Sequence, residues 1–396
     1  MYSENFEIIN YKSFIKNNFP NSVEEKNFFS VYSSFQEEKN IIKNGVGLRI
    51  IEEPVVIKLT GKDTLDFIHR ISTNKIKDLQ NFQKINTLFL NEKGRFISRS
   101  TFACLENEYL IISETDFESR LYSWINKYII MEDIKTENQS SKYSLLEFIG
   151  PQTNSFLTLL IGDELSKINE RDFRKFDVDG FSFFMFFTKE NNNQFIYKIL
   201  IEQNKLIDFY KYLDSIKSVF DLALIGESAY DYYRIKNLIP KFPNEINAET
   251  NPHEVNLIYE VDFKKGCYIG QEVIARLDTY DKVQRKLIRA EINSTKNIID
   301  KNLFDDDNFI IGKITTEHLE LFNEILCLIK KSSLNGNLEL PVNFDEQKII
   351  LKLIDADTSK WKYIQKQATK GKHHYSVGKE FGKMIYEFLL MEPLMN

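Results

Sequence analysis

Apolar and polar residues between positions 55 and 145 follow an order that predicts a helix and then three strands. Leu65, Ile68 and Ile71 have helical spacing, and the polar residues 60–63 before them have the pattern of a capping box. Apolar runs then predict strands at residues 87–90, 96–104 and 109–112.

Polar residues mark the turn and the second helix of this region. Asn91-Glu92-Lys93-Gly94 is typical of a type I turn, so the first two strands should form a hairpin. A second capping-box pattern at residues 115–118 opens a predicted helix. Its apolar residues 117, 121, 125 and 128 share one face.

The same order of elements recurs between residues 146 and 225, although few residues are shared. We predict strands at residues 181–187 and 195–201, a turn at 191–193 and a helix at 205–216. The first of these runs is far shorter than the ~20 residues of a membrane-spanning helix, so it indicates a buried strand. The recurrence predicts a duplicated hairpin-plus-helix layer, an α+β fold with antiparallel sheets and helices on one face.

The pattern changes at about residue 283 to short alternating runs, which predict a small β-barrel or sandwich. The predicted strands lie at residues 287–292, 309–315 and 325–329, and the predicted turns at 305–308 and 334–337. The lysine-rich stretch 359–383, with the apolar run 381–390, predicts either a terminal helix on the barrel or an exposed basic tail. We expect three parts, residues 1–282 with units at about 55–145 and 146–225, a barrel-like domain 283–356 and a partly helical extension 357–396.

Composition and charge limit the classes of protein to which this chain can belong. Of the 396 residues, 42% are hydrophobic and 28% charged, which is typical of a soluble globular protein. The net charge is −6, so charge favours neither a nucleic-acid nor a membrane partner. Three cysteines are too few for a disulfide framework, and the first 19 residues lack a signal or transit pattern, so we expect a cytoplasmic protein. No glycine-rich loop has dinucleotide or P-loop spacing.

Residues 258–276 contain the side chains that are most informative about function. A strand-like lead at 258–263 precedes a tight turn in which Gly266 and Gly270 flank Cys267, and a helix follows. Both glycines can adopt positive backbone φ. The adjacent lysines and the helix N-terminus would favour a thiolate, so Cys267 is either a reactive thiol or a small buried side chain. The other cysteines, Cys104 and Cys327, lie in apolar strand patterns and are interpreted as inert core thiols.

The histidines support no metal or hydrolase motif. His69 falls in the first predicted helix, where packing or capping is the simplest role. His373 and His374 are adjacent and lack further ligands at helical spacing, so we expect an exposed pair.

The octapeptide Lys265-Gly266-Cys267-Tyr268-Ile269-Gly270-Gln271-Glu272 resembles the signature of the folate-binding YgfZ family. Members of this family are relatives of the glycine-cleavage T-protein, an aminomethyltransferase, and take part in iron–sulfur protein maturation. The resemblance spans about residues 50–290. It also includes residues 61–63, 69–74, 87–95, 233–235 and 251–254.

The resemblance implies a T-protein-like fold that binds tetrahydrofolate or a related folate in a central cavity. It implies Cys267 as the functional thiol, and iron–sulfur client proteins or assembly factors as partners of a monomeric protein. Glu254 could accept from pterin nitrogens and Tyr268 could supply a ring face. Arg234 or Arg276 could bind the folate carboxylates or make structural ion pairs instead. The remaining expected ligand contacts are Lys265, Gly266, Gly270, Gln271 and Glu272.

Two departures from the T-protein pattern favour an accessory role over one-carbon transfer. T-proteins carry an aspartate shortly after the hairpin glycine, where this chain has Ser98 and Arg99. Losing such an acid costs ~100-fold to 10,000-fold in rate. T-proteins also do not require the cysteine. The alternatives are aminomethyl transfer by another carboxylate, such as Glu92 or Glu272, and a scaffold that binds neither folate nor a client.

A third departure concerns the turn after residues 233–235. Leu238 stands where relatives commonly have glycine, and Lys236 where T-proteins have an acid. Leucine resists a left-handed backbone, so we expect a different local turn.

Overall fold

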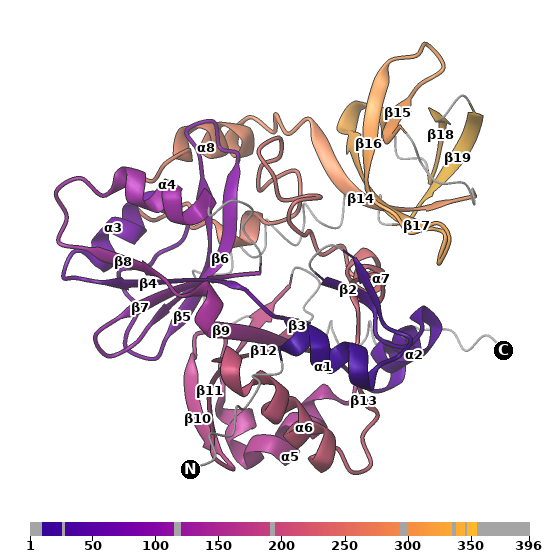
Figure 1. Cartoon of the computed structure of the whole chain (residues 1–396). Helices are drawn as coiled ribbons and strands as arrows, with labels where there is room; N and C mark the ends of the chain where they lie inside the picture. The colour runs from indigo at the N-terminus through magenta and orange to yellow at the C-terminus, as the bar shows by residue number, and fades with distance from the viewer. Residues whose placement is uncertain are drawn as a thin grey trace, which may run out of the picture.

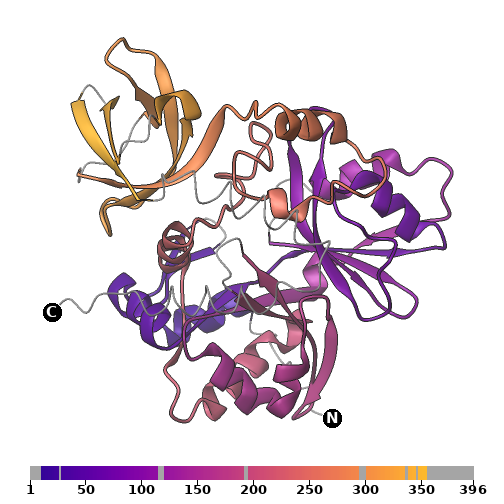
Figure 2. The ribbon, with the colours of Figure 1, turned by 180° about the vertical axis from the view of Figure 1, so that it is seen from behind.

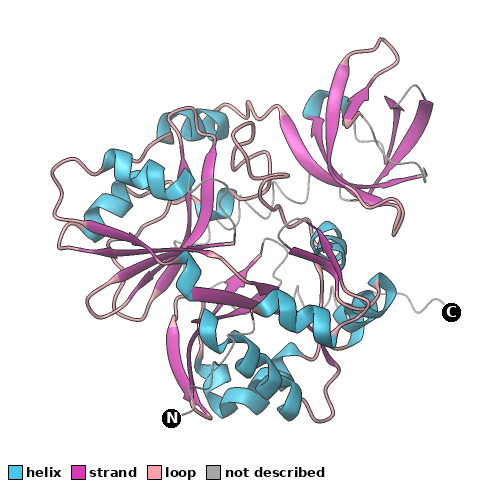
Figure 3. Ribbon diagram, viewed as in Figure 1, coloured by secondary structure: helices cyan, strands magenta, loops and turns pink. Residues whose placement is uncertain are grey.

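The computed structural model describes residues 10–354 apart from 26–27, 115–119, 191–194, 294–299, 335–337 and 345–346. Two sheets with helices on their outer sides form the body of the molecule, and a barrel follows at the C-terminal end of the described chain (Figures 1 and 3). No helix in these ranges is long and apolar enough to cross a membrane.

The first sheet has five antiparallel strands in the order β5-β6-β7-β4-β8. Its strands are β4 (Val55–Thr60), β5 (Lys84–Leu90), β6 (Phe96–Cys104), β7 (Tyr109–Ser113) and β8 (Lys135–Asn138). Helices α3 (Thr64–Ile71) and α4 (Arg120–Tyr128) bury their apolar faces against it. The predicted hairpin is confirmed, because the Gly94 amide donates to the Asn91 carbonyl and Gly94 has a φ of 67°.

The second sheet has six strands in the order β10-β11-β12-β9-β3-β13. Its strands are β3 (Val46–Ile51), β9 (Tyr143–Ile149), β10 (Arg174–Val178), β11 (Phe181–Lys189), β12 (Phe195–Glu202) and β13 (Leu222–Leu224). Helices α1 (Tyr11–Asn18), α5 (Thr153–Ile161) and α6 (Leu206–Ile216) cover its outer face. Strand β13 runs parallel to β3, so this sheet is not wholly antiparallel as predicted.

The inner faces of the two sheets pack on each other around an apolar cluster that includes Ala103, Ile112, Leu145, Phe186 and Leu200. Each sheet contains three consecutive strands followed by a helix, β5–β7 with α4 and β10–β12 with α6. The two sheets thus share an order of elements, and the division into units at about 55–145 and 146–225 stays a prediction. The candidate site lies between the sheets, beyond the apolar cluster.

The C-terminal part is a closed barrel of six strands, as predicted, in the order β14-β17-β16-β15-β18-β19. The strands are β14 (Arg285–Ile292), β15 (Asn302–Phe304), β16 (Ile310–Thr316), β17 (Glu324–Lys330), β18 (Glu339–Phe344) and β19 (Gln347–Leu353). Seen from behind, the barrel stands apart from the helices of the second sheet (Figure 2). The connecting elements are β1 (Val23–Glu25), β2 (Phe28–Val31), α2 (Phe35–Asn44), α7 (Glu227–Lys236) and α8 (Gln271–Thr279).

Two local predictions are wrong. Asp63, not Thr60, precedes α3, and its side chain makes no capping bond there but accepts from the Asp133 amide at 2.8 Å. The predicted strand lead at 258–263 is instead a short 3-10 helix, η5 (Ile258–Glu260). Its apolar residues pack with i,i+3 spacing, because Ile258 and Val261 both enter the cluster around Leu88 and Tyr268.

Leu238 is also found in a conformation that the sequence argued against. Its φ is 52°, in the left-handed region, two residues after the end of α7. The side chain packs partly buried against the cluster that contains Val261, which offsets the backbone strain.

Four predictions fall wholly or mostly outside the described residues. They are the capping box at 115–118, the turn at 191–193, the turn at 334–337 and the extension 357–396 with its histidine pair.

Candidate functional site

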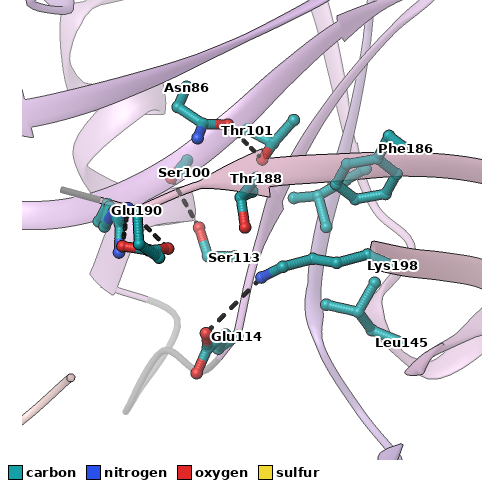
Figure 4. A pocket seen from close by; sticks show the side chains of 12 residues that line it. Asn86, Ser100, Thr101, Ser113, Glu114, Leu145, Phe186, Thr188, Glu190 and Lys198 are labelled. Atoms are coloured by element: carbon teal, nitrogen blue, oxygen red, sulfur yellow. Dashed lines mark hydrogen bonds and ion pairs between the residues drawn. The ribbon is translucent and has the colours of Figure 1, made fainter. Parts of the chain in front are cut away.

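A cavity lies between the two sheets where their inner faces become polar (Figure 4). Its volume is about 40 Å³, which is room for roughly three water molecules at ~10–15 Å³ each. Pockets that hold drug-sized ligands measure ~300–1,000 Å³. Its lining residues are Asn86, Arg99, Ser100, Thr101, Ile112, Ser113, Glu114, Leu145, Phe186, Thr188, Glu190 and Lys198.

Arg99 connects the first sheet to the second and to η5. Its Nε donates to Glu260 at 2.9 Å, and its Nη2 donates to Glu190 at 2.9 Å and to the Tyr259 hydroxyl at 3.1 Å. Burial alone would lower the pKa of Arg99, but the two carboxylates raise it well above its usual range. Burial raises the pKa of Glu260, and Arg99 opposes that shift. The guanidinium is therefore a permanently charged link between three segments.

A second buried ion network begins at Arg49 on β3. Its guanidinium lies 2.7 Å from both Glu147 and Glu227 and 3.1 Å from Glu114. Lys198 lies 2.6 Å from Glu147. Burial alone would raise the pKa of Glu114, but Arg49 and Lys198 lower it to about 2. The pKa of Glu227 is also lowered by Arg49 against the effect of burial, so Glu114 and Glu227 are poor proton donors near neutral pH.

The Thr188 hydroxyl is a polar group of the cavity lining that lacks a hydrogen-bond partner. Its hydroxyl is buried and makes no hydrogen bond within the described residues, whereas the Asn86 carboxamide oxygen accepts from Thr101 at 3.1 Å. Phe186, Leu145 and Ile112 form an apolar wall. An unsatisfied hydroxyl beside an apolar wall is suited to a small ligand that has one polar edge.

Two residues expected to bind ligand, Arg234 and Glu254, make structural contacts instead. Arg234 is fully buried, where it contacts Asp231 and donates to Glu245 at 2.9 Å. Glu254 accepts from Arg95 at 3.0 Å and from Arg285 at 2.8 Å, so it ties the β5–β6 hairpin to the barrel. Neither is among the residues that line the cavity.

The signature residues Lys265 and Tyr268 are anchors of their loop. The Lys265 ammonium donates to the carbonyls of His69, Ser72 and Asn74 at the end of α3. Tyr268 packs in the apolar cluster under the hairpin, and its buried hydroxyl has no partner within the described residues. Burial raises the pKa of Tyr268.

Cys267 is exposed at the surface between these two buried anchors. It does not line the cavity between the sheets, so the expected contact between its thiol and that pocket is absent. Cys104 and Cys327 are buried, as predicted, and burial raises the pKa of each to about 12.

The structure requires glycine at one of the two glycine positions of the signature and not at the other. Gly270 has a φ of 84°, and a Cβ there would lie 2.6 Å from the Asn91 carbonyl oxygen. Gly266 has neither a positive φ nor any atom within 4 Å of a Cβ position. The prediction of a positive φ is therefore confirmed for Gly270 and wrong for Gly266.

At the end of the signature and just beyond it, Glu272 and Arg276 are exposed. Gln271 begins α8, and the side chains of Glu272 and Arg276 are 79% and 72% exposed and lie 3.5 Å apart. Glu92, the other carboxylate suggested as a substitute acid, accepts from the Tyr128 hydroxyl at the surface. Neither Glu92 nor Glu272 lines the interior cavity.

Four charged residues of the two ion networks were not among the predicted site residues: Glu190, Glu260, Lys198 and Arg49. Arg49 and Lys198 stand singly inside otherwise apolar strands, which is a signal of buried ion pairing. Among the described residues, no group of three or more His, Cys, Asp or Glu side chains is placed to hold a metal ion.

Comparison with known proteins places this geometry in a family. The family model described as the GCVT N-terminal domain matches residues 12–265. An aminomethyltransferase of Staphylococcus carnosus is 25% identical over 295 residues, which are 72% of this chain and 78% of that protein. A putative chloroplastic transferase of Arabidopsis thaliana is 24% identical over 297 residues, or 74% of this chain and 67% of that protein.

A solved structure shows the same fold. The glycine cleavage system aminomethyltransferase T of Bartonella henselae superposes with a TM-score of 0.68 at 15% identity, over 81% of this chain and 88% of that one. The predicted T-protein-like fold is thereby confirmed. Since the family model matches more than half of the residues, the chain belongs to the GCVT N-terminal domain family.

Proposed function

We propose that this protein binds a reduced folate between its two sheets and assists the assembly or repair of iron–sulfur enzymes, with Cys267 as its functional thiol. Three things support the proposal: the family, the resemblance of residues 265–272 to the YgfZ signature, and the identity of the residue at position 99.

Position 99 is the observation that carries the proposal. T-proteins have an aspartate in this part of the hairpin, whereas Arg99 here points between the sheets and is held by Glu190 and Glu260. An arginine so paired neither gives nor takes a proton near neutral pH. Ordinary aminomethyl transfer would therefore lack its acid, and neither Glu92 nor Glu272 is placed to replace it.

The side chains that line the cavity offer groups that suit a pterin, but the cavity itself is too small for one. The free Thr188 hydroxyl and the Asn86 carboxamide suit a pterin edge, and Phe186 suits its ring face. A volume of about 40 Å³ is too small for the bicyclic ring. Binding of a pterin therefore requires the Arg99 side chain to break its hydrogen bonds with Glu190 and Tyr259. The Tyr259 side chain is partly exposed.

Cys267 is suited to a partner outside this chain. Lys265 and Tyr268 fix the loop from both sides, while the thiol itself is exposed. A rigid, accessible thiol can bind a client iron transiently or exchange with a client thiol.

Calorimetric titration with tetrahydrofolate tests the folate half of the proposal. We expect binding, and about fivefold weaker binding by Thr188→Val, because one hydrogen bond is worth about 1 kcal/mol. Thr153→Val is the matched control, since Thr153 also has a buried, unpartnered hydroxyl but lies on α5, away from the cavity. No binding by the wild-type chain would refute this half.

Rescue of a cluster-dependent enzyme tests the thiol. Cells that lack this protein should regain that enzyme with the wild-type chain and not with Cys267→Ala or Cys267→Ser at equal abundance. Cys267 is exposed, so neither change should reduce folding. Full rescue by both variants would remove the thiol from the function.

Aminomethyl transfer to tetrahydrofolate is the second candidate. The names of the relatives favour it, and so does Glu260, a carboxylate near the cavity whose pKa burial raises. Glycine-cleavage turnover with purified partner proteins separates the candidates. Formation of methylene-tetrahydrofolate that is lost in Glu260→Gln would establish the transferase.

A further inference from the structure

A second pocket, which shares no residue with the cavity between the sheets, lies in the barrel. Its volume is about 430 Å³, within the ~300–1,000 Å³ of pockets that hold a ligand. The turn between β15 and β16, the residues after β17, the start of β18 and the end of β19 form it. Its apolar lining residues are Ile311, Leu340, Pro341 and Leu353.

Apolar side chains beside this pocket are exposed. Ile350 lies opposite Pro341 across β18 and β19, and the Leu338 carbonyl accepts from the Leu353 amide at 2.7 Å. Leu338 and Ile350 are both exposed, and so is Ile354, the residue after Leu353. Single exposed apolar residues are common, but a group of them next to an apolar pocket indicates an interaction surface.

The charged residues that line the pocket are all acidic. Asp306 is paired with Lys348 at 2.7 Å, and the Asp305 carboxylate accepts from the Asp307 amide within their turn. The carboxylates of Asp307 and Glu339 make no ion pair or hydrogen bond with a described residue. The pocket therefore suits a partner that is both apolar and basic.

Residues 359–370, which follow the barrel in the chain, have this complementary chemistry. Trp361, Ile364 and Ala368 stand three and four residues apart. The same stretch contains four lysines and no acid. It can therefore place apolar side chains in the pocket and ammonium groups beside the free carboxylates.

We propose that residues 359–370 of the same chain dock on this barrel pocket, with Trp361 among the apolar side chains that enter it. The chain leaves the barrel at the pocket, because Leu353 lines it and the described residues end at Ile354. Residues 355–360 span about 20 Å when extended, which allows Trp361 to return to the pocket. Of the two alternatives for this segment, the pocket favours docking on the barrel over an exposed tail.

The covalent link to the barrel favours this occupant over a separate basic peptide. A short tether gives a segment an effective concentration in the millimolar range, so that even a weak contact is occupied. The inference does not depend on the proposed function, because the pocket shares no residue with the cavity between the sheets.

Carbodiimide cross-linking of the full-length chain tests the proposal. The reagent joins a carboxylate to an ammonium group only where the two are in contact. We expect amide links from Asp307 or Glu339 to lysines of residues 359–370, identified by peptide mass. In an equal mixture of ¹⁴N and ¹⁵N protein, each link should join peptides of one isotope. Links of mixed isotope would overturn the proposal in favour of a second copy of the chain, and the absence of links to residues 359–370 would overturn it outright.

The fluorescence of Trp361 provides an independent measurement. The other tryptophan is the buried Trp124, so Trp124→Phe leaves Trp361 as the only indole. We expect acrylamide to quench Trp361 at least threefold more slowly in this protein than after the further changes Asp307→Lys and Glu339→Lys, both at exposed positions. Glu320→Lys is the matched control, since Glu320 is an exposed acid of the barrel that does not line the pocket, and it should leave the quenching rate unchanged.

Equal quenching of Trp361 in all three proteins would overturn the proposal. If the Trp124→Phe protein does not fold, the cross-links of the wild-type chain still decide.

Discussion

At the residue scale, the partner of a buried charge decides what its side chain can do. Lys198 and Arg49 share the Glu147 carboxylate, so both charges are compensated inside the second sheet. An unpaired buried charge is costly, and a lysine in that position loses its proton instead. Burial lowers the pKa of Lys84 to about 8, whereas at Lys198 burial is outweighed by the Glu147 carboxylate, which raises the pKa. The same principle makes Arg99 a link between segments and not an acid.

Gly270→Ala should destabilise the protein by about 2–4 kcal/mol. The φ of 84° is unfavourable for alanine, and the new Cβ would lie 2.6 Å from the Asn91 carbonyl oxygen, where α8 meets the hairpin turn. Gly266→Ala is the matched control in the same loop, because nothing lies within 4 Å of its Cβ position. Urea unfolding of both variants measures the difference. Equal urea midpoints for the two variants would show that the hairpin turn moves to accommodate the added methyl group.

At the element scale, local pattern predicts some of the strands but not the site. Strand β6 has the predicted bounds, since the turn at residues 91–94 that precedes it is a local signal. Residues 258–263 were misread because a short apolar run fits both a strand and a 3-10 turn. Glu190 and Glu260 could not be assigned to Arg99 from sequence, because their meeting depends on how two sheets and η5 pack.

Lys265→Met should loosen the end of α3. The substitution keeps the apolar stem but leaves the carbonyls of His69, Ser72 and Asn74 without their donor, which should cost about 2–4 kcal/mol. Amides of α3 should exchange hydrogen faster than those of α4. Lys264→Met, one residue earlier and exposed, should change stability by less than about 0.5 kcal/mol. Unchanged exchange in α3 would mean that the ammonium does not hold this helix.

At the scale of the whole molecule, buried polar links join segments that are far apart in the chain. Arg99 joins the two sheets, and Glu254 joins the hairpin to the barrel. Arg234 on α7 contacts Glu245 and the Thr316 hydroxyl on β16, so it connects the body to the barrel as well. Such links contribute less to net stability than to a single arrangement of parts, because desolvation offsets much of their attraction.

Arg234→Met should therefore loosen the barrel on the body. Loss of the guanidinium leaves Glu245, which is fully buried, without its cation, and we expect a loss of about 3–5 kcal/mol in the free energy of unfolding. Hydrogen exchange should rise first in β16, because the Thr316 hydroxyl loses its contact with Arg234. Arg276→Met is the control, since that arginine is exposed and its pair with Glu272 is worth little. If Arg234→Met unfolded as the control does, with β16 still protected, Arg234 would not be the residue that fixes the barrel to the body.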